Sequence, residues 1–348
     1  MAFSLSLSLL MAVAGASKLS SVVFVNNNEM SGKKSGVFQF ELSSRRATKL
    51  PVSLTSDYDY VSGAAVCDGA YYAIYTEIET GAIGLARIAN FSSSATVSYL
   101  AVPSLLHGVW CDPRQPGKLL VVRSDPGSTQ AIFHIARYDP ATQTSADIAQ
   151  IPPSWTWAED DAVFAFDADA YRVWATGPVT SGIFENSGAV YAVGECTGAR
   201  TLPSPVPPPE KFTKHHHTPS TQTDVAANGT FTAFTLGYEA GWLGYVYPTS
   251  ATTGFGYRQT DKNYDLRWAT FSLAGGKITY TDGATVSTTL WAGGAPLAAC
   301  DDLIVAASLP SNNLTVADAR TGETIWALPL ADLGVPAPNA GALFALCA

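Results

Sequence analysis

Ala64-Ala65-Val66-Cys67-Asp68 is a phrase of small apolar residues, a cysteine and an aspartate that returns along the chain. Close copies are Gly108-Val109-Trp110-Cys111-Asp112 and Leu297-Ala298-Ala299-Cys300-Asp301, and the spacing from Cys67 to Cys111 is 44 residues. A repeat of this length indicates one supersecondary unit used many times. Weaker relatives of the phrase are Val163 to Asp167, Asp224 to Asn228 and Arg267 to Phe271.

Each phrase is followed by a turn signal and then by further short β-rich runs. Asp68-Gly69 leads into the run from Tyr71 to Tyr75, and Pro116-Gly117 leads into Leu119 to Val122. Asp-Gly is a strong hairpin signal because both central residues of the turn need a positive φ. A third and a fourth run follow, as in Ile83 to Ile88 and Ala95 to Val102. Four antiparallel strands per repeat predict an all-β fold, a single β-propeller.

The two ends of the chain complement each other in this pattern. The C-terminal stretch from Gly341 to Ala348 looks like one more copy of the phrase, and no later strands follow it. The N-terminal region contains only later strands, such as Val22 to Val25 and Gly36 to Leu42. We therefore expect the last strand to complete the first blade, which would remove an exposed sheet edge. Counting phrases predicts seven blades. Six is the alternative, because the repeat near Asn263 to Gly294 is weakly marked.

One segment carries a family resemblance. Val316-Ala317-Asp318-Ala319-Arg320-Thr321-Gly322-Glu323-Thr324-Ile325-Trp326 resembles the Asp-x-x-Thr-Gly-x-x-x-Trp tail of a quinoprotein-type repeat. On this motif the chain is similar to the quinoprotein-like and WD40/YVTN-like β-propellers. The resemblance implies a fold but does not by itself imply a cofactor, because propellers host many unrelated functions.

The N-terminus and the sequons predict secretion. Phe3 to Ala16 is an uncharged apolar run that ends in an Ala-Gly-Ala cleavage pattern, so we expect residues 1–16 to be a signal peptide and residues 17–348 the propeller domain. A buried first strand is the alternative for this run. Sequons at Asn90, Asn228 and Asn313 predict N-glycosylation. A net charge of -9 without a basic cluster argues against nucleic acid as a partner, and we expect no membrane insertion.

Five cysteines raise the question of disulfide bonds, because secretion favours them. We expect Cys67, Cys111, Cys300 and Cys347 to occupy one register on the innermost strands of different blades, where each faces the next blade's opposite surface. The favoured interpretation is therefore small apolar side chains packed between blades. If a pair forms, the candidates are Cys67 with Cys111 and Cys300 with Cys347. The odd number leaves at least one thiol over, and the fifth cysteine is Cys196.

Metal-binding candidates are few, and no local catalytic motif of the common kinds occurs. Glu159 and Asp160 open the densest acidic cluster, and His215 and His217 belong to a short histidine run after a proline-rich stretch. Calcium or a transition metal could use such oxygen or imidazole ligands. The acidic spacing matches no EF-hand loop, and the histidine run is typical of a long exposed loop. We expect no cofactor, because a single quinoprotein-like repeat tail carries no cofactor contacts.

Propeller topology predicts one face rich in aromatic residues. The loops that enter the inner strands share a face with those that join the second and third strands. Large amphipathic rings there are typical of recognition surfaces. We predict a secreted binding protein whose ligand is a glycan, peptide or protein held around the central channel. The alternatives are a propeller enzyme (a metal-dependent hydrolase, lactonase or lyase) and a structural extracellular component. The expected ligand-binding residues are Tyr58, Tyr60, His107, Trp155, Trp157 and Tyr264.

Overall fold

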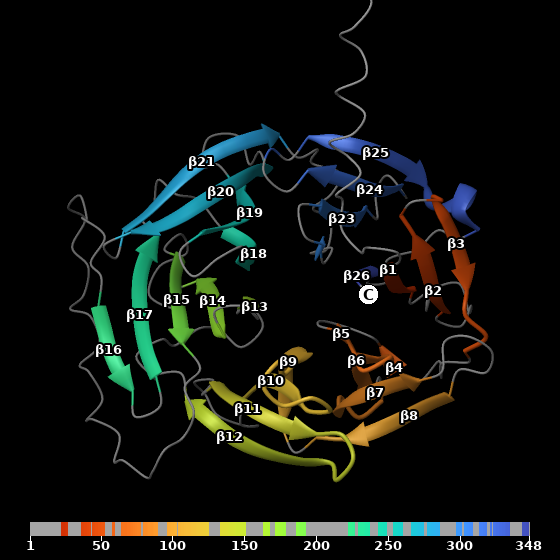
Figure 1. Ribbon diagram of the computed structural model, residues 1–348, viewed down its shortest axis with the longest axis horizontal. Coiled ribbons are helices and arrows are strands. Elements are labelled where there is room, and N and C mark those ends of the chain that lie inside the picture. The colour runs from red at the N-terminus through yellow and green to blue at the C-terminus, as the bar shows by residue number, and fades with distance from the viewer. Residues whose placement is uncertain are drawn as a thin grey trace, which may run out of the picture.

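The structure is a computed structural model of the full chain, and its architecture is a ring of antiparallel β-sheets (Figure 1). It describes the backbone of residues 22–26, 36–42, 44–52, 58–59, 64–77, 79–89, 96–102, 104–124, 133–150, 163–167, 171–178, 186–192, 222–226, 229–236, 243–248, 253–259, 266–274, 277–285, 297–300, 303–308, 313–318, 321, 323–334 and 343–347.

Three sheets are built mainly from the first half of the chain. Sheet 1 has the order β26 (Leu343–Cys347), β1 (Val22–Asn26), β2 (Gly36–Glu41) and β3 (Arg46–Lys49). Sheet 2 contains β4 (Tyr58–Asp59), β5 (Ala64–Cys67), β6 (Ala70–Glu77), β7 (Ile83–Ala89) and β8 (Thr96–Ala101), with β4 and β5 both pairing with β6. Sheet 3 has β9 (Leu105–Cys111), β10 (Leu119–Ser124), β11 (Phe133–Asp139) and β12 (Thr144–Gln150).

The remaining strands form three further sheets. Sheet 4 has the order β13 (Val163–Asp167), β14 (Arg172–Pro178), β15 (Asn186–Ala192), β17 (Gly229–Leu236) and β16 (Gln222–Ala226). Sheet 5 contains β18 (Leu243–Pro248), β19 (Thr253–Gln259), β20 (Leu266–Ala274) and β21 (Lys277–Thr285). Sheet 6 contains β22 (Leu297–Cys300), β23 (Leu303–Ser308), β24 (Asn313–Asp318) and β25 (Thr324–Pro329), and a 3-10 helix, η5 (Leu330–Leu333), follows β25.

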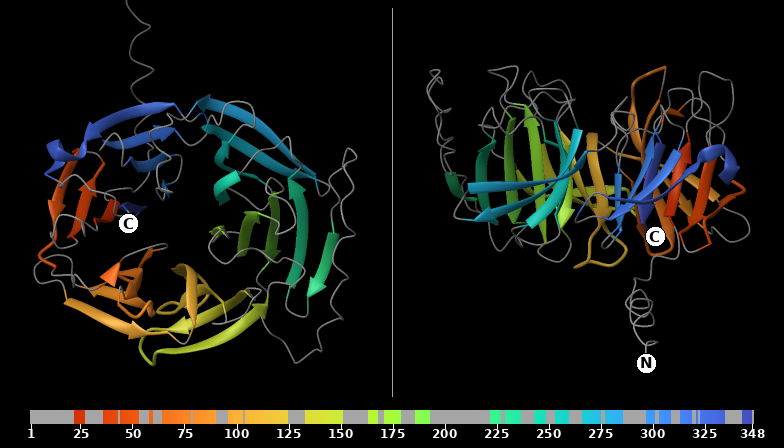
Figure 2. Two further views of the ribbon diagram at one scale, coloured as in Figure 1. Left: turned by 180° about the vertical axis from the view of Figure 1, so that it is seen from behind. Right: turned by 90° about the horizontal axis from the view of Figure 1, so that it is seen from above.

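The sheets stand around a central axis, and each presents one strand to it. The ring is wider than it is deep when seen from the side (Figure 2). The inner strands pack in sequence, β22 against β26, β26 against β5, β5 against β9, β9 against β13 and β13 against β18. The C-terminal β26 pairs antiparallel with the N-terminal β1, with Phe24 opposite Ala345. The all-β prediction is confirmed, with antiparallel sheets that are mostly four-stranded.

Two of the seven sequence phrases do not form inner strands. Asp224 to Asn228 begins within β16, at the edge of sheet 4, and Arg267 to Phe271 falls within β20, the third strand of sheet 5. The inner strand of sheet 5 is β18, which contains no copy of the phrase. The phrase misleads here because small and β-branched residues suit any half-buried strand, whereas an inner position is decided by pairing order. The described residues therefore contain six sheets rather than one per phrase.

Apolar side chains fill the spaces between neighbouring sheets. Between sheets 2 and 3, the cluster includes Ile74, Leu85, Leu119, Val121 and Tyr138, all nearly or completely buried. Sheets 1 and 6 enclose a second cluster, made by the buried residues Phe38, Phe40, Leu314, Val316, Leu330 and Leu333. Alternate residues of a strand point to the same face of its sheet, so the apolar residues of β2 and of β24 point toward each other's sheet. The core therefore consists of layers between neighbouring sheets. Among the described residues no helix is long and apolar enough to cross a membrane.

Candidate functional site

Sheet 3 shows how the two faces of the ring differ. The entry face is the end where β9 begins and β10 ends, marked by Ser104 and Ser124. The turn face is the opposite end, where residues 112–118 join β9 to β10 and residues 140–143 join β11 to β12. The entry face is the one on which the sequence predicts the ligand site.

An ion-pair cluster lies toward the entry face of sheet 3. The guanidinium of Arg123 on β10 donates to both carboxylate oxygens of Asp147 on β12, at 2.9 Å from Nε and 2.7 Å from Nη2. Its Nη1 donates to Ser104 Oγ at 2.9 Å, and His134 Nδ1 lies 3.2 Å from Asp147 Oδ2. Such a bidentate pair is directional as well as attractive. Arg123 therefore links Ser104, the residue before β9, to strands β10 and β12. This link stabilises the ends of β10 and β12, which the segments 125–132 and 151–162 follow in the chain.

His107 lies within β9 instead of in the entering loop, and it faces sheet 4. Its Nε2 is 2.8 Å from Ser124 Oγ, and its ring packs edge-on against Phe133 and near Phe164 of β13. Ser124 is completely buried. Although serine, histidine and aspartate all occur here, Asp147 binds a different histidine, His134. The contacts of His107 thus form a packed contact between sheets 3 and 4.

The turn face of sheet 3 contains a buried carboxylate. The side chain of Asp112 is completely buried and accepts hydrogen bonds from Arg137 Nε at 2.7 Å and from Tyr171 Oη at 3.0 Å. It also accepts from the backbone N–H of Arg114, which forms the turn expected of an aspartate after a strand. The guanidinium of Arg114 stacks on the Tyr171 ring at 3.8 Å. Burial is the main cause of the raised pKa of Tyr171. Because Tyr171 directly precedes β14 of sheet 4, Asp112 links sheets 3 and 4.

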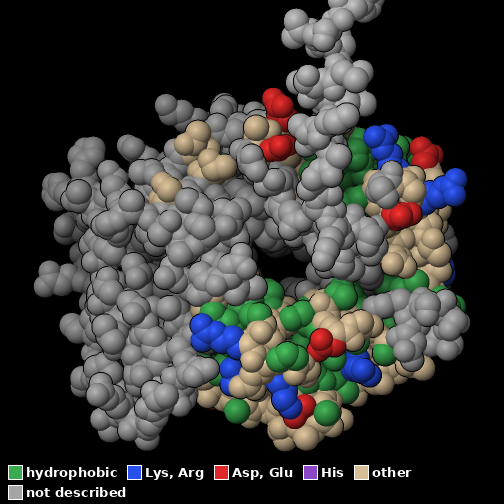
Figure 3. Space-filling view, in the orientation of Figure 1, with side chains coloured by type: hydrophobic (Ala, Val, Ile, Leu, Met, Phe, Trp, Pro, Cys, Tyr) green, Lys and Arg blue, Asp and Glu red, His purple; other side chains and the backbone are tan. Residues whose placement is uncertain are grey.

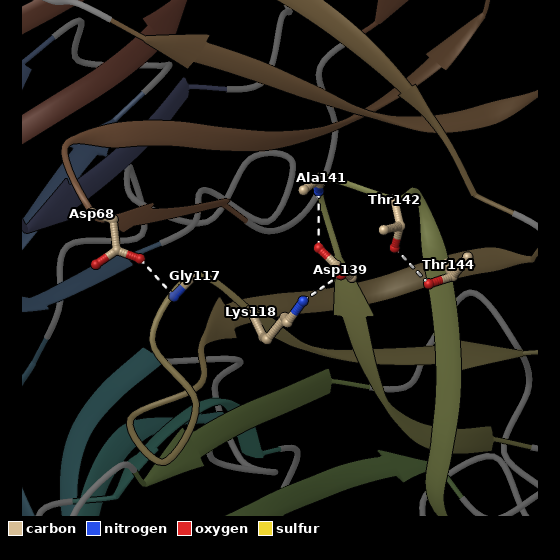
Figure 4. Close-up of polar contacts among 7 residues, drawn as sticks. All are labelled: Asp68, Gly117, Lys118, Asp139, Ala141, Thr142 and Thr144. Carbon is tan, nitrogen blue, oxygen red and sulfur yellow. Dashed lines mark hydrogen bonds and ion pairs between the residues drawn. The ribbon is translucent and has the colours of Figure 1, made fainter.

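A second polar group, drawn in Figure 4, extends along the same face. Asp68 of sheet 2 reaches across to sheet 3 and accepts from the backbone N–H of Gly117 at 2.8 Å. Lys118 forms an ion pair with Asp139, which also accepts from the N–H of Ala141 at 2.9 Å. The bond from Lys118, followed by that from Ala141, lowers the pKa of Asp139 to about 2. Asp68 and Asp112, which follow the inner strands β5 and β9, therefore join neighbouring sheets in addition to shaping turns.

Cys67 and Cys111 form a disulfide bond, which corrects the expectation of unpaired apolar cysteines. Their Cα atoms are 5.5 Å apart. The prediction failed because it treated equivalent positions on successive sheets as facing away from each other. The inner strands β5 and β9 pack directly against each other near the axis, so equivalent strand ends come within bridging distance.

Most of the predicted ligand residues lie outside the described part of the chain. This holds for Tyr60, Trp155, Trp157 and Tyr264, whereas Tyr58 is described by its backbone in β4, opposite Glu77. The metal candidates Glu159, Asp160, His215 and His217, the signal peptide, and the sequons at Asn90 and Asn228 also lie outside it. Asn313 begins β24 and is partly buried. Within the described ranges, no three His, Cys, Asp or Glu side chains gather as a metal site.

Sequence reasoning missed Arg123, Asp147 and Tyr171. Arg123 lies on β10 and Asp147 on β12, two strands separated by β11. A polar residue in the alternating pattern of a strand does not indicate which residue it will contact. The space-filling view shows a hollow at the centre of the ring, with basic and acidic side chains intermingled over the described sheets below it (Figure 3).

No protein-family model and no curated protein sequence matches the chain. A chain in the crystal structure of the nidogen/laminin complex is similar, with 8% identity over 94% of this chain and 97% of that one, and a TM-score of 0.52. A putative 6-phosphogluconolactonase from Bacteroides fragilis shares 12% identity, covering 95% and 99% of the two chains with a TM-score of 0.41. The six-bladed lectin of Aleuria aurantia shares 11% identity, covering 75% and 72% with a TM-score of 0.39. The propeller resemblance read from the sequence is confirmed, and the chain has the β-propeller fold.

Proposed function

We propose that this protein is an extracellular binding protein that holds a glycan, peptide or protein on the entry face of a propeller. The observation that carries the proposal is the Arg123–Asp147 pair with Ser104, which anchors three chain segments at one end of sheet 3. The segment 151–162, which follows β12, includes Trp155 and Trp157. A rigid scaffold that displays aromatic loops is the usual plan of a recognition surface.

The disulfide bond between the inner strands β5 and β9 supports the extracellular location. Disulfides persist in oxidising compartments and are rare in the cytosol, so the Cys67–Cys111 bond favours secretion. The apolar N-terminal run and the three sequons agree with this location. We accordingly propose cleavage after residue 16 and glycosylation at Asn90, Asn228 and Asn313.

The proposed platform is a closed ring of six blades. Six described sheets and the pairing of β26 with β1 support this count over the seven expected from the sequence. A chain of the nidogen/laminin complex has the same fold, so such a ring can take part in a protein assembly. Closure by the C-terminal strand would hold the entry-face loops in a constant arrangement.

The test is ligand screening with the secreted, glycosylated protein. Glycan-array binding and affinity capture from extracellular extracts would be measured for the wild type and for a Trp155→Ala/Trp157→Ala variant. We expect a ligand that the double variant binds at least about tenfold more weakly, as is typical when central aromatic anchors are truncated.

A matched control removes an exposed apolar side chain elsewhere. Ile325 on β25 is 53% exposed and lies outside the loop segments, so Ile325→Ala should leave binding unchanged. Equal binding by the wild type and the tryptophan variant would reject the entry face as the site. Turnover of a captured ligand would assign the chain to the enzymes instead.

A further inference from the structure

The cysteines of the inner strands occupy equivalent positions. Cys67 is the last residue of β5, Cys111 of β9, Cys300 of β22 and Cys347 of β26. The hairpins of Cys67 and Cys300 also agree in register. Cys67 pairs with Ala70 and Cys300 pairs with Leu303, so the two paired positions are three apart in sequence in each hairpin.

These four strands are consecutive around the ring. β22 packs against β26, β26 against β5, and β5 against β9. Successive blades of a propeller are related by similar rotations, so the same register produces a similar separation between neighbouring strand ends. The separation is known for one such pair, because the Cα atoms of Cys67 and Cys111 are 5.5 Å apart and the sulfurs are bonded.

The observed bond leaves one partner for Cys347. Its strand, β26, packs against β5 on one side and β22 on the other. Cys67 at the end of β5 is already bonded to Cys111. Cys300 at the end of β22 is therefore the remaining cysteine in an equivalent neighbouring position, while Cys196 follows β15, the third strand of sheet 4.

We infer that Cys300 and Cys347 form a second disulfide bond that ties the C-terminal strand to sheet 6. It forms by two thiol–disulfide exchanges with the disulfide of an oxidoreductase in the secretory pathway. One cysteine thiolate attacks that disulfide and displaces one thiolate. The second cysteine attacks the mixed disulfide and displaces the other, so the donor leaves as a dithiol.

This bond reinforces the place where the C-terminal strand joins the N-terminal strand through hydrogen bonds and packing. β26 belongs to sheet 1 through its pairing with β1, and no peptide bond joins these two strands directly. A covalent link from β26 to β22 prevents the C-terminal strand from leaving the ring by itself. The inference goes beyond the proposed binding function and does not depend on any ligand.

The test is a peptide map of the full secreted protein, alkylated without reduction, freed of N-glycans and digested with trypsin. Arg320 separates the two cysteines, so the bond links peptides 278–320 and 321–348. We expect this linked pair beside the pair 50–87 with 88–114, and an alkylated Cys196 in peptide 173–200. Reduction should separate both pairs.

Two single variants provide an independent readout. Cys347→Ser should make Cys300 alkylatable and Cys300→Ser should do the same for Cys347, each with a lower melting temperature and with the Cys67–Cys111 pair intact. Alkylated Cys300 and Cys347 in the wild type would overturn the inference. So would a link from peptide 321–348 to 173–200 or to 50–87.

Discussion

The first two copies of the repeat phrase both end in Cys-Asp, but the two aspartates differ in burial and in their contacts. Cys67-Asp68 and Cys111-Asp112 each end an inner strand, and the cysteines are bonded to each other. Asp68 is exposed and has one hydrogen bond to the next sheet, whereas Asp112 is 3% exposed and binds Arg137 and Tyr171. Local sequence therefore determines a strand end and a turn, and the neighbouring sheet decides how strongly the aspartate is held.

The two sheet interfaces accordingly have different chemistry. Sheets 2 and 3 meet through a mainly aliphatic cluster, a disulfide, and hydrogen bonds to the Asp68 carboxylate and the Ala101 carbonyl. Sheets 3 and 4 meet through aromatic pairs such as Trp110 with Phe166 and through the buried carboxylate of Asp112. Of five predictions, ordered from the largest expected effect to the smallest, the first three test this contrast and the last two test single side chains of sheets 2 and 3.

Removing the disulfide should have the largest effect. Replacing both cysteines, Cys67→Ala/Cys111→Ala, opens a loop with a sequence separation of 44 and should lower the free energy of unfolding by about 4 kcal/mol. The loss follows from the greater freedom of the unfolded chain. Urea unfolding of the variant and of the wild type, both under non-reducing conditions, measures it. A loss below about 1 kcal/mol, near the lower end of the range for disulfides, would show that the bond contributes little to stability.

Asp112→Ala should cost about 3 kcal/mol, because Arg137 and Tyr171 lose a buried partner. We expect the lower end of the range for buried pairs, since the side chain of Arg137 is 25% exposed and water can reach it. Asp68→Ala, at the equivalent position, should cost about 1 kcal/mol or less. Equal losses in urea unfolding would contradict the difference between the two copies.

Tyr171→Phe isolates the hydroxyl contact between sheets 3 and 4. The variant removes a donor to the Asp112 carboxylate and leaves the ring against Phe166 and Arg114. We expect a loss of about 1.5 kcal/mol, typical of a hydrogen bond to a charged group. In a double-mutant cycle with Asp112→Ala the two losses should not add. Additive losses would mean that the hydroxyl acts elsewhere.

Tyr71→Phe on β6 should leave stability unchanged or raise it by about 1 kcal/mol. The hydroxyl is completely buried and has no hydrogen-bond partner among the described residues, and burial alone raises its pKa. Thermal unfolding measures the change, with Tyr138→Phe as the control. The Tyr138 hydroxyl donates to the carbonyl of Ala101 at 3.0 Å, so its removal should destabilise. A clear loss in Tyr71→Phe would reveal a partner for that hydroxyl.

Asp139 should contribute a small, acid-sensitive part of stability. Its pKa of about 2 in the folded protein lies below the ordinary 3.8, so its contribution is present above about pH 4 and is lost as the pH falls toward 2. Asp139→Asn should flatten the pH dependence of unfolding over that interval. Asp332→Asn, at an exposed carboxylate on η5, is the control. Equal slopes for wild type and Asp139→Asn would contradict the assignment.

Much of the fold could be predicted because strands and tight turns are coded locally. The expected runs Tyr71 to Tyr75, Ile83 to Ile88 and Leu119 to Val122 all lie within observed strands. The inner strand β18 was missed, since Leu-Gly-Tyr-Val-Tyr-Pro contains neither the cysteine nor the aspartate of the phrase. The candidate site was less predictable, because Arg123 and Asp147 meet only through the pairing of β10, β11 and β12.

By itself, the sequence determined the repeated hairpins, the turn residues such as Asp68-Gly69, and the strand at each end of the chain. These features depend on contacts between residues close in sequence and on alternation along a strand. Only the tertiary structure decided that Cys67 bonds to Cys111 and that Asp112 is buried while Asp68 is not. Those outcomes depend on which strand ends approach each other around the axis, and that approach follows from the packing of whole sheets.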